Sequence, residues 1–235
     1  MSPVSELILP HEIDKIAAVD AIEAVHPNVE QVASEDDKLV ALSLVSAATQ
    51  FQPIESNCGT QFHARRNSGK RPLNQIWWVV QHSTEGPTAR GAASWFSNPA
   101  SQGSAHRCMD NNECYRTLGD DEIAWGAPGA NYHGLHNEQA GYAKWTTLIW
   151  SKQHRQLLER DAYKTAIDCR KYKIPPYFRV AAKLKQGIKG VTTHWECTQA
   201  FGGSHYDPGK GWPRYYFMLR VRYHYKRLSH VKPVI

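Results

Sequence analysis

The sequence lacks the features that define membrane and secreted proteins. No run approaches the about 18 consecutive apolar residues that a membrane-spanning helix needs. Residues 1–10 lack the basic start of a secretory signal peptide, and acidic residues follow them. We therefore expect no membrane insertion and synthesis as a soluble cytoplasmic chain. A target outside the membrane would then require a separate route of export.

Cysteine is also scarce, and its spacing excludes a zinc ribbon. The five cysteines include no Cys-x-x-Cys pair, and their number is odd. Cys108 and Cys114 flank residues 109–113, which we expect to form the tip of a hairpin. These two side chains could form a disulfide in an oxidising compartment. The alternative, two reduced thiols in a protein made in the cytoplasm, stays open.

Positively charged side chains are nearly absent from the first part of the chain. Residues 1–55 hold ten acidic and two basic side chains, a net charge of −8. The whole chain carries +6, so the remainder carries +14, because −8 and +14 sum to +6. A basic body fits a polyanionic target, such as a bacterial cell wall or nucleic acid. Solubility and pairing between the two parts explain the pattern equally well.

The chain divides into three parts by composition. Residues 1–50 form an acidic segment in which residues 11–26 and 35–49 have helical patterns. Residues 51–72 are polar and rich in Gly and Pro, which is typical of a linker or wrapping arm. Residues 73–235 form the predicted catalytic domain. The first segment could be a docking module, a wall-binding element or a cap on that domain.

Strand and helix patterns alternate along the predicted catalytic domain. An apolar run at 76–82 and a β-branched run at 190–194 indicate buried strands. We expect a hairpin at 104–118, a strand at 135–143, helices at 88–96, 152–172 and 180–186, and a helix or strand at 215–228. Strands interleaved with helices predict an α/β fold, with a central mixed β-sheet flanked by helices.

Two histidines stand at the ends of predicted strands. His82 ends the first apolar run, and His194 ends the run at 190–194, after which we expect a Gly-rich loop leading to His205 and Asp207. Two imidazoles and one carboxylate suit Zn²⁺ and leave the fourth tetrahedral position open for water. This ligand set is typical of a hydrolytic zinc site rather than a structural one.

Four short motifs follow one another along the predicted catalytic domain: His82-Ser83-Thr84-Glu85-Gly86, Ser104-Ala105-His106, Asn131 with Gly134-Leu135-His136-Asn137-Glu138, and His194 with Asp207-Pro208-Gly209. They occur in the order seen in the type-2 N-acetylmuramoyl-L-alanine amidases, which the sequence resembles. This family includes phage endolysins and peptidoglycan recognition proteins, and the sequence most resembles endolysins of phages that infect actinobacteria. The resemblance covers roughly residues 76–223.

The resemblance implies a role for each matching residue. It implies one zinc ion per chain on His82, His194 and Asp207, with Cys197 as a fallback ligand. It places Glu138 where many relatives carry a catalytic glutamate. His205 takes the place of a lysine that stabilises the transition state, or is itself a ligand while Asp207 only forms the turn. The expected substrate contacts are Ser83, Thr84, His106, Trp125 and Asn131.

Three positions depart from the family pattern. Ala105 replaces a tyrosine that some phage relatives use. The common Ile-Gly-Ile-Glu sequence reads Leu135-His136-Asn137-Glu138 here. Gly126 stands where the family often has a histidine after Ala-Trp. Because Ala105 stands in place of that tyrosine, Glu138 is the remaining candidate for the catalytic base.

The resemblance implies an enzyme that cuts the amide between the lactyl group of N-acetylmuramic acid and L-alanine in peptidoglycan. We expect a phage endolysin that reaches the wall through a holin, and a virion-associated lysin is a second possibility. A non-catalytic peptidoglycan-binding protein is the alternative from another class, but such relatives lose a zinc ligand. A nucleic-acid-binding protein is the third, and it leaves the three-ligand pattern unexplained.

Overall fold

The computed structural model describes residues 58–228, so the predicted helices at 11–26 and 35–49 lie outside the described residues. Among the described residues, no helix is long and apolar enough to cross a membrane. The elements in chain order are β1 (Asn67–Lys70), η2 (Leu73–Gln75), β2 (Trp78–Ser83), α3 (Ala89–Ser97), β3 (Arg107–Met109), β4 (Cys114–Arg116), β5 (Glu122–Ala124), β6 (Gly134–Gln139), α4 (Thr147–Gln153), α5 (Arg155–Lys171), α6 (Ala181–Lys185), β7 (Gly190–Thr193), α7 (His194–Phe201) and α8 (Arg214–Leu228).

A five-stranded mixed sheet forms the centre of the fold, with the strand order β4-β3-β6-β2-β7. Strands β3, β6, β2 and β7 run parallel to their neighbours, and only β4 at the edge is antiparallel. Strands β1 and β5 form a separate antiparallel pair. The α/β class with a mixed sheet, predicted from the alternation of strands and helices, is confirmed.

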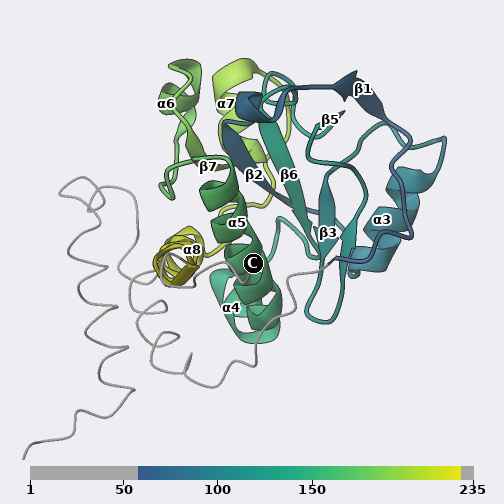
Figure 1. Cartoon of the computed structure of the whole chain (residues 1–235). Helices are drawn as coiled ribbons and strands as arrows, with labels where there is room; N and C mark the ends of the chain where they lie inside the picture. Colours follow the sequence, from purple (N-terminus) through teal and green to yellow (C-terminus); the bar gives the residue numbers. More distant parts are fainter. Residues whose placement is uncertain (1–57, 229–235) are drawn as a thin grey trace, which may run out of the picture.

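Helices cover both faces of this sheet. Helix α5 runs across one face, and α8 packs beside it (Figure 1). The main core lies between α5, α8 and the sheet, where Val79, Leu135, Leu158 and Phe217 are fully buried. Helices α3 and α7 pack against the strands from the other side. The space between α3 and α7 holds the site described below.

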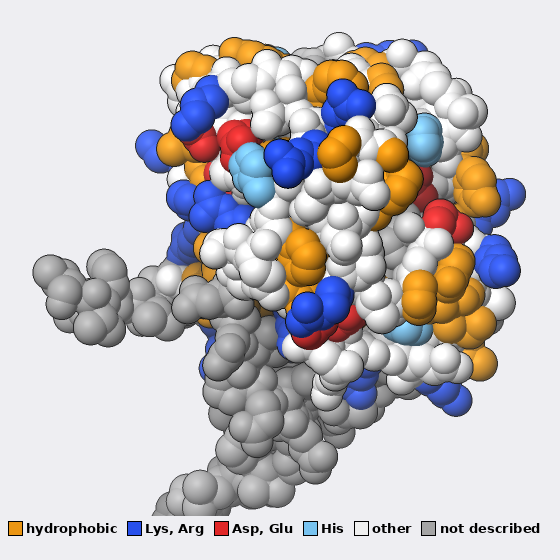
Figure 2. All heavy atoms as spheres, turned by 90° about the vertical axis from the view of Figure 1, so that its right-hand side faces the viewer, with side chains coloured by type: hydrophobic (Ala, Val, Ile, Leu, Met, Phe, Trp, Pro, Cys, Tyr) orange, Lys and Arg blue, Asp and Glu red, His pale blue; other side chains and the backbone are white. Residues whose placement is uncertain are grey.

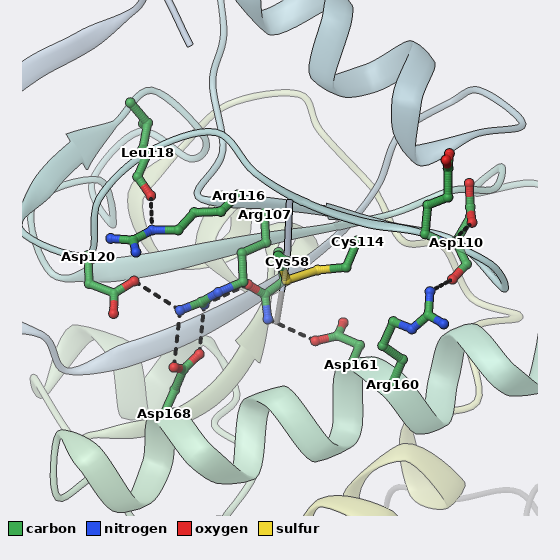
Figure 3. Close-up of a disulfide and its surroundings, with 12 residues drawn as sticks. Cys58, Arg107, Asp110, Cys114, Arg116, Leu118, Asp120, Arg160, Asp161 and Asp168 are labelled. Atoms are coloured by element: carbon green, nitrogen blue, oxygen red, sulfur yellow. Dashed lines mark hydrogen bonds and ion pairs between the residues drawn. A yellow bond between two sulfur atoms is a disulfide. The ribbon is translucent and has the colours of Figure 1, made fainter. Parts of the chain in front are cut away.

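A polar layer connects the sheet to α5. Asn137 donates from Nδ2 to Oδ1 of Asp161 at 2.8 Å, and Gln139 donates to Oδ2 of the same carboxylate at 2.6 Å. Arg107 makes two hydrogen bonds to the carboxylate of Asp168 and one to Asp120 (Figure 3). The polar residue at position 137, which departs from the family pattern, is therefore fully paired within the fold.

Neither of the two states considered for Cys108 and Cys114, a disulfide between them or two reduced thiols, is the one observed. Cys114 is bonded to Cys58 (Figure 3), and Cys108 is a free, buried thiol. The register of the hairpin explains the difference, because Cys108 pairs with Tyr115 and Cys114 pairs with Met109. Neighbouring residues of a strand face opposite sides of the sheet. The two cysteines therefore point away from each other, and the segment that carries Cys58 supplies the partner.

Other boundaries differ from the sequence predictions in smaller ways. The helix predicted at 152–172 corresponds to α5, which begins at Arg155, and a separate helix α4 precedes it with His154 between the two. The strand predicted at 135–143 ends at Gln139, and the final segment is the helix α8. Residues 67–70, which we placed in the linker or wrapping arm, form strand β1 against β5. The side chains of Ala64 and Arg71 in this arm are buried.

Charged side chains are mixed on the face that carries α3 and the β1–β5 pair. Figure 2 shows basic side chains scattered over this face, several of them next to acidic ones, with hydrophobic groups between them. Two of the ion pairs within the described residues are Lys70 with Asp121 and Arg90 with Glu113. On this face the positive charge does not form one continuous patch of the kind that binds nucleic acid.

Candidate active site

The side chains of His82, His194 and Asp207 meet at the carboxyl ends of two parallel strands. His82 lies near the end of β2, and His194 follows directly after β7, the neighbour of β2. His82 Nδ1 lies 3.2 Å from Asp207 Oδ2, and His194 Nδ1 lies 3.0 Å from Asp207 Oδ1. One ligand atom from each residue lies within 4.8 Å of the others, and all three residues are buried. Parallel strands bring their carboxyl ends to one edge of a sheet, which explains the meeting of distant residues.

A helix cap fixes the position of His194. The Oγ1 of Thr193 accepts a hydrogen bond from the backbone N–H of Glu196, and His194 is the first residue of α7. We predicted a Gly-rich loop directly after His194, and the structure places helix α7 there first. The sequence does hold the signal, because Thr193-x-x-Glu196 is a capping-box pattern. The loop with Gly202 and Gly203 follows the helix and returns the chain to Asp207.

The electrostatics of the cluster favour a neutral imidazole at His194 and an ionised carboxylate at Asp207. Burial lowers the pKa of His194, which leaves a nitrogen lone pair available at neutral pH. Burial alone would raise the pKa of Asp207, but its contacts with His194 and His82 outweigh burial and hold that pKa far below its usual range. Ligand atoms around a tetrahedral zinc lie about 3.3 Å apart, given metal–ligand bonds of about 2 Å. The two distances from a histidine nitrogen to the Asp207 carboxylate, 3.2 and 3.0 Å, fit that spacing.

Glu138 is a buried carboxyl group beside this cluster. Its residue pairs in register with His82 across β2 and β6, and its Oε2 is buried without a hydrogen-bond partner. Burial, and then the nearby charges of Asp207 and Glu85, raise the pKa of Glu138 well above its usual value. An unpartnered carboxyl oxygen with a raised affinity for protons is suited to accept a proton from a water molecule.

An open cleft of about 810 Å³ gives access to the cluster and to Glu138. Its walls come from the turn after β2, from α3, and from the loops around Trp125 and His205. Trp95 and Trp125 are both largely exposed there. The cleft is therefore large enough to hold a substrate of several groups, and its lining combines exposed tryptophans with the polar side chains of the cluster and Glu138.

The N-acetylmuramoyl-L-alanine amidase family matches residues 72–210, which is more than half of the chain. The chain belongs to this family. It is 26% identical to N-acetylmuramoyl-L-alanine amidase A of Achromobacter lyticus over 154 residues, which cover 62% of this chain and 84% of that relative. Its fold is similar to that of the hydrolase AmiA of Staphylococcus aureus, with a TM-score of 0.62 at 16% identity over 86% of this chain and 96% of that one. The predicted family is thus confirmed, whereas the likeness to actinobacteriophage endolysins stays a prediction.

Four of the five expected substrate contacts of this amidase family member line the cleft. These are Ser83, Thr84, Trp125 and Asn131. Two of them also hold the local backbone. Thr84 donates from its hydroxyl to the carbonyl of Gly86, and Asn131 Oδ1 accepts the N–H groups of Gly126 and Ala127.

His106 lies elsewhere. Its side chain is fully buried under the sheet edge and is not part of the cleft wall. Its Nδ1 accepts the backbone N–H of His136, and its Nε2 lies 3.1 Å from the carbonyl oxygen of Glu122. Burial, followed by the charges of Arg71 and Arg107, lowers the pKa of His106 to about 3. The imidazole is therefore neutral, and it supports the strand rather than touching a substrate.

The sequence predictions missed Glu85 as part of the site. Glu85 lines the cleft, and its Oε1 accepts hydrogen bonds from the Ser83 hydroxyl and from the backbone N–H of Ala143. Its backbone adopts a φ of 49°, which is uncommon for a residue other than glycine. The position directly before Gly86 in a turn was the available signal, but a turn glutamate alone does not indicate a function.

Proposed function

We propose that this protein is a zinc-dependent hydrolase of peptidoglycan. It cleaves the amide between the lactyl group of N-acetylmuramic acid and L-alanine. The single observation that carries this proposal is the convergence of three buried ligand atoms, from His82, His194 and Asp207, beside the unpartnered carboxyl oxygen of Glu138. The family membership of the chain supports the choice of bond, as does its similarity to an amidase of Achromobacter lyticus.

The proposed zinc ligands are Nδ1 of His82, Nδ1 of His194 and one carboxylate oxygen of Asp207. Zinc held there supplies an activated water, because it lowers the pKa of a bound water to about 7. The chain contributes two imidazole nitrogens, the negative charge of Asp207 and a buried position at the floor of the cleft. A set of three protein ligands matches catalytic zinc sites, in which the fourth coordination position is left to solvent.

Glu138 and His205 have separate roles in this proposal. Glu138 accepts a proton at Oε2 from the attacking water and returns it to the leaving amine. His205 stands at the mouth of the cluster, with its ring stacked on that of His194 at a centroid distance of 4.2 Å. It can donate a hydrogen bond to the oxygen that becomes negative as the amide is attacked.

We further propose that the protein is a phage endolysin. In this role it is made in the host cytoplasm, passes the membrane through a holin and degrades the wall during lysis. The motifs around His82, Asn131 and Asp207, which resemble those of phage endolysins, support this context. The basic character of residues 56–235 is compatible with a target that carries negative charge.

Zinc content and wall hydrolysis, measured together for three proteins, test the proposal. We expect one zinc per chain in the wild type, loss of zinc in His194→Ala, and a zinc-loaded but inactive Glu138→Ala. The wild type should release new N-terminal alanine from peptidoglycan. Zinc binding without alanine release would favour a recognition protein, and a wild type without zinc would refute the site.

A further inference from the structure

His136 lies directly behind the proposed zinc ligand His82. It is fully buried on β6, on the same face as Glu138, and its Nδ1 lies 3.0 Å from Nε2 of His82. The other ring nitrogen of His82, Nδ1, points to Asp207. His82 is thus contacted through both nitrogens, by the carboxylate on one side and by a second imidazole on the other.

We propose that His136 is a positioning residue that holds His82 in the tautomer and orientation required for zinc. This inference rests on the proposed function. A zinc ligand needs a lone pair at Nδ1 of His82, so the ring proton must reside on Nε2. The atom that faces Nε2 is Nδ1 of His136, which must therefore accept this proton in a hydrogen bond. Ligand histidines usually donate their second N–H to a carboxylate, a carbonyl or water, and here an imidazole takes that place.

The surrounding residues hold His136 in one orientation. Its backbone N–H donates to the neutral imidazole of His106 at 3.0 Å. Its ring is packed between two glycines, because a Cβ on Gly126 would stand 2.5 Å from its Nδ1 and a Cβ on Gly134 would stand 2.7 Å from its Nε2. Asn131 fixes the backbone at Gly126. The close backbone of these two glycines therefore restricts the positions that the ring can take.

The same geometry accounts for two departures from the family pattern. His136 replaces the glycine of the common Ile-Gly-Ile-Glu sequence, and Gly126 replaces the histidine that often follows Ala-Trp. In this structure the imidazole of residue 136 fills the space in which a side chain at residue 126 would begin. The two changes are thus physically linked, because a side chain at one position requires its absence at the other.

Substitutions that separate the hydrogen bond from the volume of the ring test this role. His136→Asn keeps an acceptor, because its Oδ1 is attached to Cγ as Nδ1 is in histidine. His136→Leu fills similar space without an acceptor. His133→Leu is a matched control, since His133 stacks on Trp77 at a centroid distance of 3.6 Å and its Nδ1 contacts the carbonyl of Gln75, outside the cluster.

The measured quantities are the zinc dissociation constant, from competition with a chelator, and the thermal unfolding of the metal-free proteins. We expect His136→Leu to weaken zinc binding by about 10- to 100-fold. His136→Asn and His133→Leu should stay within a few-fold of the wild type. Equal zinc affinity in His136→Leu and the wild type would overturn the inference, and so would equal weakening in the Leu and Asn variants.

A measurement on the unsubstituted protein covers the case in which a variant fails to fold. Nitrogen NMR of the zinc-loaded wild type should show His82 and His136 both protonated at Nε2. A proton on Nδ1 of His136 would overturn the inference while leaving the proposed function intact. A wild type that takes up no zinc would overturn both, whereas zinc uptake without alanine release would refute only the proposed reaction.

Discussion

His82 and Glu138 stand opposite each other in register on the parallel strands β2 and β6. Both side chains face the cleft, whereas their strand neighbours Gln81 and Asn137 face α5 and bond to Thr165 and Asp161. A slip of one residue in this register would send Glu138 to the α5 side, because side chains alternate along a strand. The pairing of two strands thus sets the distance between the proposed metal ligand and the proposed base.

We expect Glu138→Gln to separate metal binding from catalysis. The amide keeps the volume of the carboxyl group but cannot accept a proton, so kcat should fall by about 10²- to 10⁴-fold. Zinc stoichiometry should stay at that of the wild type, because Glu138 is not among the three converging ligands. Metal analysis and release of N-terminal alanine check both parts. Activity within ten-fold of the wild type would remove Glu138 from the proposed mechanism.

Much of the candidate site could be predicted from the sequence. The strand that ends near His82 was readable from an unbroken apolar run, and parallel strands imply that their ends meet. Asp207 was expected as a ligand from its place in the loop after the second strand, whereas the role of Glu138 came mainly from motif order. Strand β6 reads Gly-Leu-His-Asn-Glu-Gln and yet is buried throughout, so its hydropathy alone would predict an exposed segment. Its burial depends on partners such as Asp161, which only the fold brings close.

The parts that the sequence did not reveal depend on contacts between distant segments. The disulfide partner of Cys114 is 56 residues away, and no local rule connects the two. His106 shares its residue type with the metal ligands, but its neighbours are Arg71 and the backbone of His136. A histidine that ligates and one that supports a strand differ in surroundings, not in sequence pattern. Helix α7 was a different kind of miss, because the capping signal at Thr193 was present.

Removal of Asp168 should destabilise the fold. Arg107 is almost fully buried, and its guanidinium donates two hydrogen bonds to Asp168, at 2.7 and 3.1 Å. Asp168→Ala leaves this charge with Asp120 as its remaining carboxylate partner. Breaking a buried pair from one side typically costs about 3–5 kcal/mol, and we expect the lower end of that range. Urea unfolding measures the loss. Asp168→Asn keeps one acceptor oxygen and should lose less unfolding free energy than Asp168→Ala. A loss below about 1 kcal/mol in Asp168→Ala, roughly the contribution of an exposed ion pair, would contradict the argument.

Reduction of the Cys58–Cys114 bond should lower stability without affecting the cleft. The bond joins residues 56 positions apart, and closing a loop of that size stabilises a folded protein by about 2–4 kcal/mol. Cys58→Ser should therefore lower the unfolding temperature under oxidising conditions and remove its dependence on reductant. Cys108→Ser serves as the comparison, because Cys108 is a free thiol. A reductant-sensitive transition that persists in Cys58→Ser would show that another pairing operates.

Acid should weaken the contact between α5 and α8. Glu159 of α5 is buried, and burial alone would raise its pKa, but contacts with His224, Arg220 and Tyr216 lower it below 4.5. A lowered folded-state pKa adds stability above the unfolded-state value, and this contribution is lost as the pH falls through the folded-state pKa. The free energy of unfolding should therefore decrease below about pH 4.5, the ordinary value for this group. Urea titrations at several pH values should show a shallower decrease in Glu159→Gln, and identical slopes would contradict the assignment.

His205→Ala distinguishes the two roles open to His205. Its side chain is 61% exposed, and its Nδ1 lies 3.7 Å from Asp207 Oδ1, farther than the Nδ1 of either His82 or His194 lies from that carboxylate. If His205 stabilises the developing oxyanion, His205→Ala keeps its zinc and loses about 10²-fold in kcat with little change in KM. If His205 were the third ligand and Asp207 only formed the turn, His205→Ala would lose zinc and Asp207→Asn would keep it. The burial of Asp207 and its contacts with both other ligands favour the first outcome, and metal analysis of the two variants side by side decides between them.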